Sequence, residues 1–95
     1  MADETRVVCV RVRGRVQGVS YRVWTADVAE ELGVAGWVRN RTDGTVEALF
    51  AGSADTVETM LERCREGPPA ARVSSVVIEQ EGGEAPKGFQ ILQTA

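Results

Sequence analysis

The segment Gly-Arg-Val-Gln-Gly-Val-Ser-Tyr-Arg, residues 14–22, carries the residues best suited to binding an anion. Glycines let a backbone wrap closely, so that successive N–H groups point inward. The segment leads into a predicted helix, whose first turn stabilises negative charge. Arg22 would fork onto the same anion. A phosphate would fit such a loop; the alternative, which the spacing alone favours, is a plain connecting loop with glycines at tight turns.

Asn40 is a second candidate, because it ends an apolar stretch just before Asp43 and Gly44, a pair typical of a hairpin turn. Strand alternation places its side chain on the face of Val38. An amide there would hold a water molecule or an anion oxygen. The alternative is a turn asparagine that bonds its own backbone. Trp37 is predicted to pack in the core or against the hairpin.

The two cysteines are not predicted to do chemistry. Cys9 and Arg15 have five residues between them, the spacing of cysteine-dependent phosphatases. In those enzymes the cysteine ends a strand, whereas here the alternation continues past Cys9, so we interpret the spacing as coincidence. Cys64 falls on the apolar stripe of a predicted helix and is interpreted as a small core residue.

Composition narrows the possible chemistry further. The 95 residues include no histidine and two cysteines, which excludes an imidazole base, a His-ligated metal and a disulfide framework. The net charge of −3 argues against a nucleic-acid partner, and an aromatic fraction of 5% argues against base stacking. Residues 1–41 nevertheless hold seven basic against five acidic side chains. A small anionic ligand near this half fits the charge distribution.

Length and hydropathy predict a single domain over residues 1–95. No apolar run approaches the roughly 20 residues that cross a membrane. Met1 to Thr5 are polar and carry two acids, unlike a secretory signal. We therefore expect a cytoplasmic protein with reduced thiols, and nothing in the sequence suggests an obligate partner, so we expect a monomer.

The elements needed to position these residues follow from periodicity. Strands are predicted over residues 6–13, 35–40, 45–51, 72–80 and 87–93, and helices over residues 21–32 and from Ser53 to Gly67. This order predicts the α+β, ferredoxin-like sandwich: βαββαβ with an extra C-terminal strand and two helices packed on one face of the sheet.

Finer features are also predicted along the second half of the chain. Ser53 is expected to cap the second helix, and Asp55 with Glu58 fits the spacing of a capping box. In the last strand, Phe89 and Ile91 are expected to point inward.

Two segments resemble signatures of the acylphosphatase family. Residues 14–22 resemble Gly-x-Val-Gln-Gly-Val-x-Phe/Tyr-Arg, and residues 36–47 are similar to Gly-Trp-Val-x-Asn-x-x-Asp-Gly-x-Val-Glu. The main departure is Tyr21, where phenylalanine is commoner, and the ring is kept. The resemblance covers nearly the whole chain in length, order and spacing.

The resemblance implies hydrolysis of acyl phosphates to a carboxylate and inorganic phosphate, without metal or cofactor. It makes Arg22 and Asn40 catalytic: Arg22 binds the phosphoryl group and Asn40 orients the attacking water. The main-chain N–H groups that it assigns to the phosphoryl group belong to Arg15, Val16, Gln17, Gly18, Val19 and Ser20. The alternative is a non-catalytic phosphate-binding module with the same fold.

Overall fold

Five strands and two helices follow one another along residues 5–95, the part of the chain described by the computed structural model. They are β1 (Thr5–Arg15), α1 (Tyr21–Leu32), β2 (Ala35–Asn40), β3 (Val46–Ser53), α2 (Ala54–Glu66), β4 (Arg72–Glu81) and β5 (Phe89–Ile91). Residues 1–4 lie outside the described residues. They make up most of the segment Met1 to Thr5, which was predicted not to be a secretory signal. Within residues 5–95, no helix has the length and apolar character to cross a membrane.

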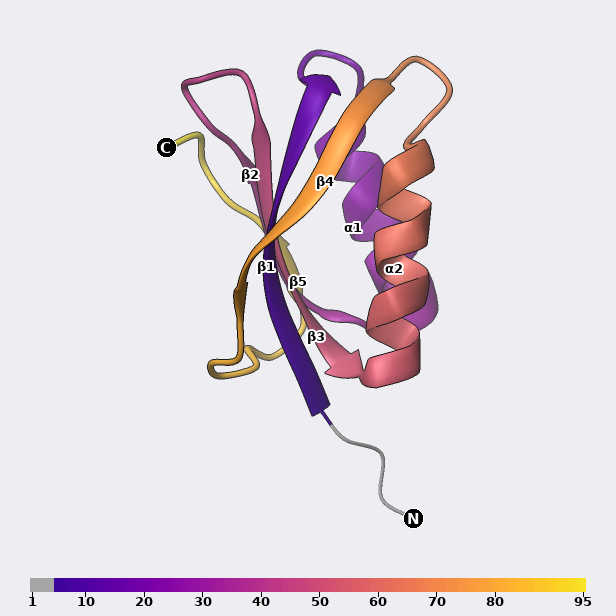
Figure 1. Cartoon of the computed structure of the whole chain (residues 1–95), viewed down its shortest axis with the longest axis vertical. Coiled ribbons are helices and arrows are strands. Elements are labelled where there is room, and N and C mark those ends of the chain that lie inside the picture. Colours follow the sequence, from indigo (N-terminus) through magenta and orange to yellow (C-terminus); the bar gives the residue numbers. More distant parts are fainter. Residues whose placement is uncertain (1–4) are drawn as a thin grey trace.

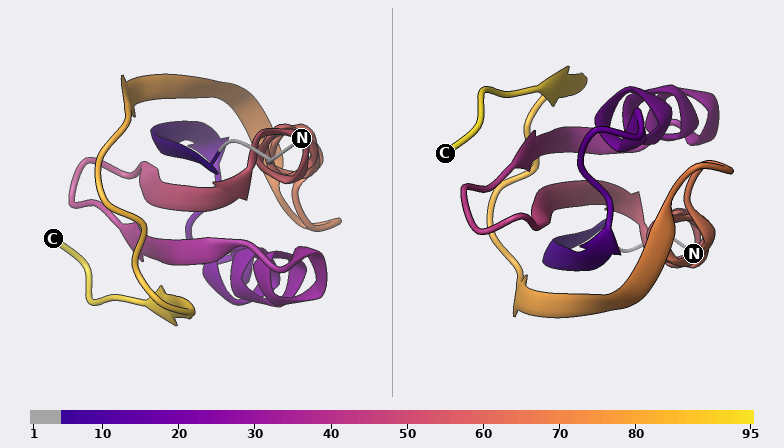
Figure 2. Two further views of the ribbon diagram at one scale, coloured as in Figure 1. Left: turned by 90° about the horizontal axis from the view of Figure 1, so that it is seen from below. Right: turned by 90° about the horizontal axis from the view of Figure 1, so that it is seen from above.

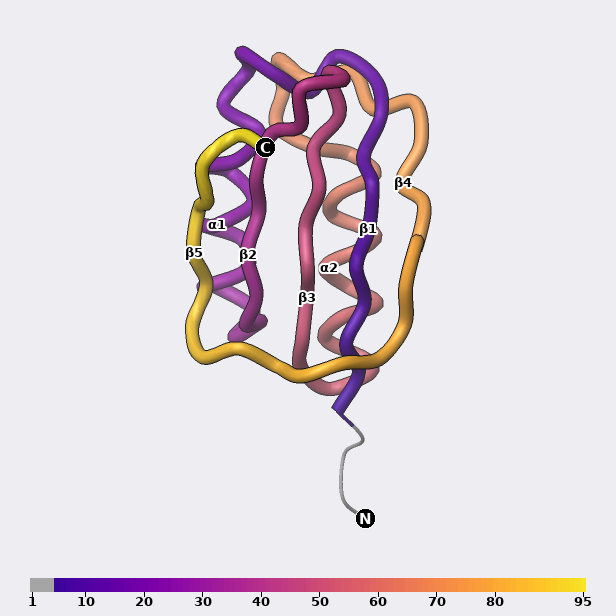
Figure 3. Tube along the Cα trace, turned by 90° about the vertical axis from the view of Figure 1, so that its left-hand side faces the viewer, coloured from indigo at the N-terminus to yellow at the C-terminus, as the bar shows by residue number. Residues whose placement is uncertain are grey.

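The strands form one mixed sheet in the order β4-β1-β3-β2-β5 (Figure 3). The pairs β1–β3, β1–β4 and β2–β3 are antiparallel, and β5 runs parallel to β2. Both helices cover the same face of the sheet, which leaves the other face without a helix (Figures 1 and 2). The predicted ferredoxin-like class, with its extra C-terminal strand, is confirmed.

The core lies between the sheet and the two helices. Val8, Val10 and Val12 on β1 are fully buried on the helix side, as their alternation predicts. The predicted stripe of α2 is also buried; it consists of Val57, Met60, Leu61 and Cys64. These two apolar surfaces hold α2 against the sheet.

Local signals define most element ends. Gly33 closes α1 in the left-handed conformation. The Ser53 side-chain oxygen accepts a hydrogen bond from the Thr56 N–H and so caps α2. The capping-box prediction is wrong, because Asp55 and Glu58 both lie inside α2, after the capping residue.

Two other packing predictions need correction. The last strand is shorter than predicted, and although Phe89 stacks near Phe50, Ile91 is 45% exposed because β5 is an edge strand with incomplete cover. Of the two placements predicted for Trp37, the core is wrong. Its ring packs instead on β2 of the hairpin, where the Arg39 guanidinium is 5.0 Å from the ring centre.

Candidate active site

The candidate anion-binding loop is shorter than predicted because β1 continues further. Gly14 and Arg15 belong to β1 and pair with Val73 and Arg72 of β4. Gly14 has φ +123°, and a Cβ there would lie 2.1 Å from the Arg72 carbonyl oxygen, so only glycine allows this approach. The loop proper therefore covers residues 16–20, and Arg15 is a strand residue at its entrance.

The loop leaves its main-chain donors free. Ser20 precedes α1 in the left-handed conformation, with φ 64°, and its side chain caps nothing. The first helical hydrogen bond runs from the Trp24 N–H to the Ser20 carbonyl. Within the described chain, the N–H groups of residues 16–20 donate to no other group. These donors and the positive end of α1 are available to an anion.

A pocket of about 300 Å³ opens between this loop, the first turn of α1 and the end of β2. Its walls are formed by Val16, Gly18, Ser20, Tyr21, Arg22, Val23 and Asn40. The structure thus brings Arg22 and Asn40 together, although they come from different elements. Arg15, Gln17 and Val19, which the sequence also suggests for the site, do not line this pocket.

Asn40 has an uncommitted acceptor. Its Oδ1 is buried and has no hydrogen-bond partner in the described part of the chain. This geometry does not match the alternative of a turn asparagine that bonds its own backbone. A buried carbonyl oxygen beside a pocket is suited to accepting a hydrogen bond from a bound water molecule.

Gln17 ties the loop to the β2–β3 hairpin through its side chain. Its Nε2 donates to the main-chain carbonyl oxygens of Arg41 and Thr45, each at 2.8 Å. The turn between them is closed by Asp43, whose Oδ1 accepts from the Thr45 N–H at 3.0 Å and from the Thr45 hydroxyl. Asn40 is therefore held against the loop by a hydrogen-bonded turn.

Tyr21 supports the site from behind. Its hydroxyl donates to the carbonyl oxygen of Cys64 at 2.7 Å, which joins the start of α1 to the end of α2. Burial raises the pKa of Tyr21, and the neighbouring Cys64 raises it further. The hydroxyl therefore acts as a structural donor.

Cys9 lies away from the pocket, on the open side of the sheet. Its Sγ is 3.6 Å from Oε2 of Glu47. Burial and the Glu47 carboxylate raise the pKa of Cys9 to about 11, so the group is a neutral thiol at pH 7. This state does not suit a phosphatase nucleophile and agrees with the coincidental spacing.

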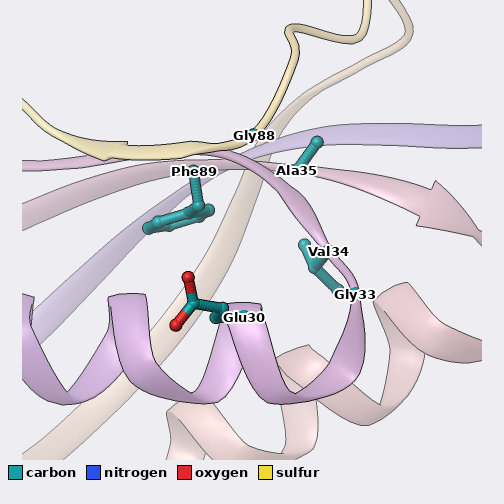
Figure 4. Close-up of a pocket in the computed structure, with 6 residues that line it drawn as sticks. All are labelled: Glu30, Gly33, Val34, Ala35, Gly88 and Phe89. Atoms are coloured by element: carbon teal, nitrogen blue, oxygen red, sulfur yellow. The ribbon is translucent and has the colours of Figure 1, made fainter.

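A second hollow, of about 260 Å³, lies at the other end of α1 (Figure 4). It is lined by Glu30, Gly33, Val34, Ala35, Gly88 and Phe89. Its ionisable side chain is the Glu30 carboxylate, which disfavours an anion. The pocket that contains Arg22 is therefore the candidate active site.

Sequence reasoning missed Val23 as a pocket residue. The signal was present: Val23 is an apolar residue that falls off the buried face of α1 and directly follows Arg22. Its 56% exposure beside the pocket is visible only in the folded chain.

The chain is similar to known proteins over almost its full length. The family model described as Acylphosphatase matches residues 8–91. A curated acylphosphatase of Nitrobacter hamburgensis is 60% identical over 87 residues, which is 92% of this chain and 86% of the relative.

Solved structures agree. A Coxiella burnetii acylphosphatase superposes with a TM-score of 0.87 at 38% identity and 93% cover of both chains. A Bacillus subtilis acylphosphatase has a TM-score of 0.84 at 31% identity, with 94% of this chain and 99% of that chain covered. By sequence and by fold, the chain belongs to the acylphosphatase family.

Proposed function

We propose that this protein hydrolyses acyl phosphates to a carboxylate and inorganic phosphate. The observation that carries the proposal is a pocket lined by Arg22, by part of the loop and by Asn40. Among residues 5–95, the loop N–H groups and Oδ1 of Asn40 have no other hydrogen-bond partner. The curated relatives that share 50–60% of its residues and carry the name acylphosphatase support this assignment.

The phosphoryl group binds between the loop and Arg22. Phosphoryl transfer needs positioning and stabilisation of charge on the equatorial oxygens more than covalent help from the protein. Preorganised N–H donors and a guanidinium supply both. We assign the donors to the main chain from Arg15 to Ser20, with residues 16–20 forming the bend itself.

The leaving group needs no proton. Cleavage of the bond between phosphorus and the acyl oxygen leaves the electron pair on a carboxylate, whose conjugate acid has a pKa of about 4–5. The pocket walls offer Arg22 and Tyr21 as ionisable groups, and the Tyr21 hydroxyl is committed to Cys64. A site without a general acid therefore suits this substrate.

The nucleophile is a water molecule. Oδ1 of Asn40 accepts a hydrogen bond from this water, which directs the water oxygen toward phosphorus as the new P–O bond forms. The pocket walls include no carboxylate within the described residues. One proton of the water therefore passes to a phosphoryl oxygen of the substrate, and the other stays on the newly bonded oxygen. The products are inorganic phosphate and the carboxylate.

Initial rates with the purified protein test the proposal. We expect turnover of acetyl phosphate and benzoyl phosphate, competitive inhibition by inorganic phosphate, and negligible turnover of glycerol phosphate, whose alkoxide is a poor leaving group. If phosphate binds but neither acyl phosphate is hydrolysed, the alternative of a non-catalytic phosphate-binding module replaces this proposal.

We further propose that the protein acts as a single-domain monomer in the cytoplasm on a small acyl phosphate, without a nucleic-acid partner. Light scattering at micromolar concentration tests the monomeric state, and a nucleic-acid gel-shift titration tests the absence of a nucleic-acid partner. A dimer or a retarded band would contradict them.

A further inference from the structure

We infer that Val23 contacts the acyl group of the substrate and selects uncharged, apolar acyl phosphates. The inference rests on the proposed function, because it concerns the part of an acyl phosphate that the loop and Arg22 do not bind. It assigns a specificity role to a residue outside the predicted catalytic set.

Exposure distinguishes Val23 from the other apolar residues of the pocket. Val16 and Tyr21 are each 1% exposed, so they form its floor. Val23 is 56% exposed and lines the same pocket. It is therefore the large apolar side chain of the pocket wall that a bound molecule can cover, and covering it removes apolar surface from water.

The size of the pocket leaves room for more than a phosphoryl group. Its volume of about 300 Å³ is many times the roughly 10–15 Å³ that a cavity needs to hold one water molecule, so it exceeds the space that one phosphorus and its oxygens fill. The acyl carbon is one bridging oxygen away from phosphorus. With the phosphoryl group beside Arg22, the acyl group extends toward the next side chain of the same helical turn, Val23.

The charge beyond Val23 adds discrimination. Asp27 follows four residues later, so helix geometry places it one turn further on the same side of α1, and it is exposed. An acyl group that carries its own carboxylate would approach this like charge. The surface therefore favours neutral apolar acyl groups over acidic ones.

The test compares kcat/KM for benzoyl phosphate with kcat/KM for acetyl phosphate. Val23→Thr keeps the shape of the side chain and adds a hydroxyl, whereas Val23→Leu enlarges the apolar surface. Val77→Thr is the matched control, because Val77 is 42% exposed on β4 and lies outside the pocket.

We expect Val23→Thr to lower the benzoyl-to-acetyl ratio about 3- to 10-fold, less than the roughly 10- to 200-fold of an enclosed apolar pocket. Val23→Leu should raise the ratio, and inhibition by phosphate should stay unchanged in both variants. A ratio that stays at the parental value in both Val23 variants, while both substrates turn over, overturns this inference and leaves the proposed function intact. If the parent hydrolyses neither substrate, the proposed function itself fails.

Discussion

The side-chain Nε2 of Gln17 lies 2.8 Å from the main-chain carbonyl oxygen of Arg41, a residue 24 positions later in the chain. A second hydrogen bond from the same nitrogen reaches Thr45. These contacts fix the loop relative to the hairpin that carries Asn40. The position of Asn40 relative to Arg22 is thus set by side-chain bonding across the fold.

Gln17→Ala should lower both kcat and stability. The change removes both donors from two main-chain carbonyls, so we expect a loss of about 1–3 kcal/mol in the free energy of unfolding. It should also reduce kcat more than it weakens phosphate binding, because Asn40, which directs the water, is no longer held in position against the loop. Urea denaturation and steady-state kinetics measure these effects. Gln80→Ala is the control, because Gln80 is an exposed residue of β4. An unchanged kcat would limit Gln17 to a structural role.

Arg22→Ala should reduce kcat/KM at least about 10²–10³-fold, the scale for losing one preorganised donor in a site of this type. The inhibition constant of phosphate should rise as well, because the guanidinium binds the ground-state anion. Arg65→Ala is the matched control and should retain activity, because Arg65 is an exposed residue of α2. Parental rates in Arg22→Ala would refute the site assignment.

Asn40→Ala should separate catalysis from binding. We expect kcat to fall while the inhibition constant of phosphate stays within a small factor of the parental value. Because Oδ1 of Asn40 is buried and has no hydrogen-bond partner among residues 5–95, its removal should leave the melting temperature unchanged or raise it. A weakened phosphate complex with normal kcat would assign Asn40 to anion binding instead.

Tyr21→Phe tests the hydroxyl that sets this chain apart from the commoner signature. The buried hydrogen bond to Cys64 is lost, and its carbonyl acceptor stays in place. The free energy of unfolding should fall by about 1–2 kcal/mol, with kcat near the parental value because the ring still lines the pocket. Chemical denaturation measures the first effect; a large drop in kcat would place the hydroxyl in the reaction.

Glu47 makes part of the stability dependent on pH. Burial raises the pKa of Glu47, but hydrogen bonds from Arg39 and Arg41 lower it, and the net pKa lies below the ordinary value. A lowered native pKa stabilises the fold above the unfolded value of about 4.3, and this contribution is lost as the pH falls through the native pKa. Glu47→Gln should therefore destabilise at pH 7 and matter less at pH 3.5, as urea midpoints would show. An equal effect at both values would contradict the ion-pair explanation; Glu62→Gln serves as the exposed control.

Sequence signals with a local cause predicted the fold well. The bounds of α1 follow from its apolar period and from Gly33, and the hairpin follows from Asp43 and Gly44. Features that depend on neighbouring strands were harder to predict from the sequence. The extension of β1 through Arg15 requires pairing with β4, and the exposure of Ile91 depends on cover at the sheet edge.

The same distinction applies to the site. The two signature segments, by their resemblance, pointed to Arg22 and Asn40, and the structure places both in one pocket. The side-chain bonds of Gln17 span 24 and 28 residues, so no local pattern reveals them. The role of Val23 depends on which side of α1 stays uncovered, which is settled only when the helix docks.

Because this pocket is assembled from α1 and β2, the recovery of hydrolytic activity reports on refolding. A chain that has regained its helices but has not docked the hairpin onto the loop holds Arg22 and Asn40 apart, so it would be silent in an assay. After dilution from denaturant, the lag before hydrolysis resumes would measure how long the hairpin takes to dock onto the loop. No fluorescent label is needed.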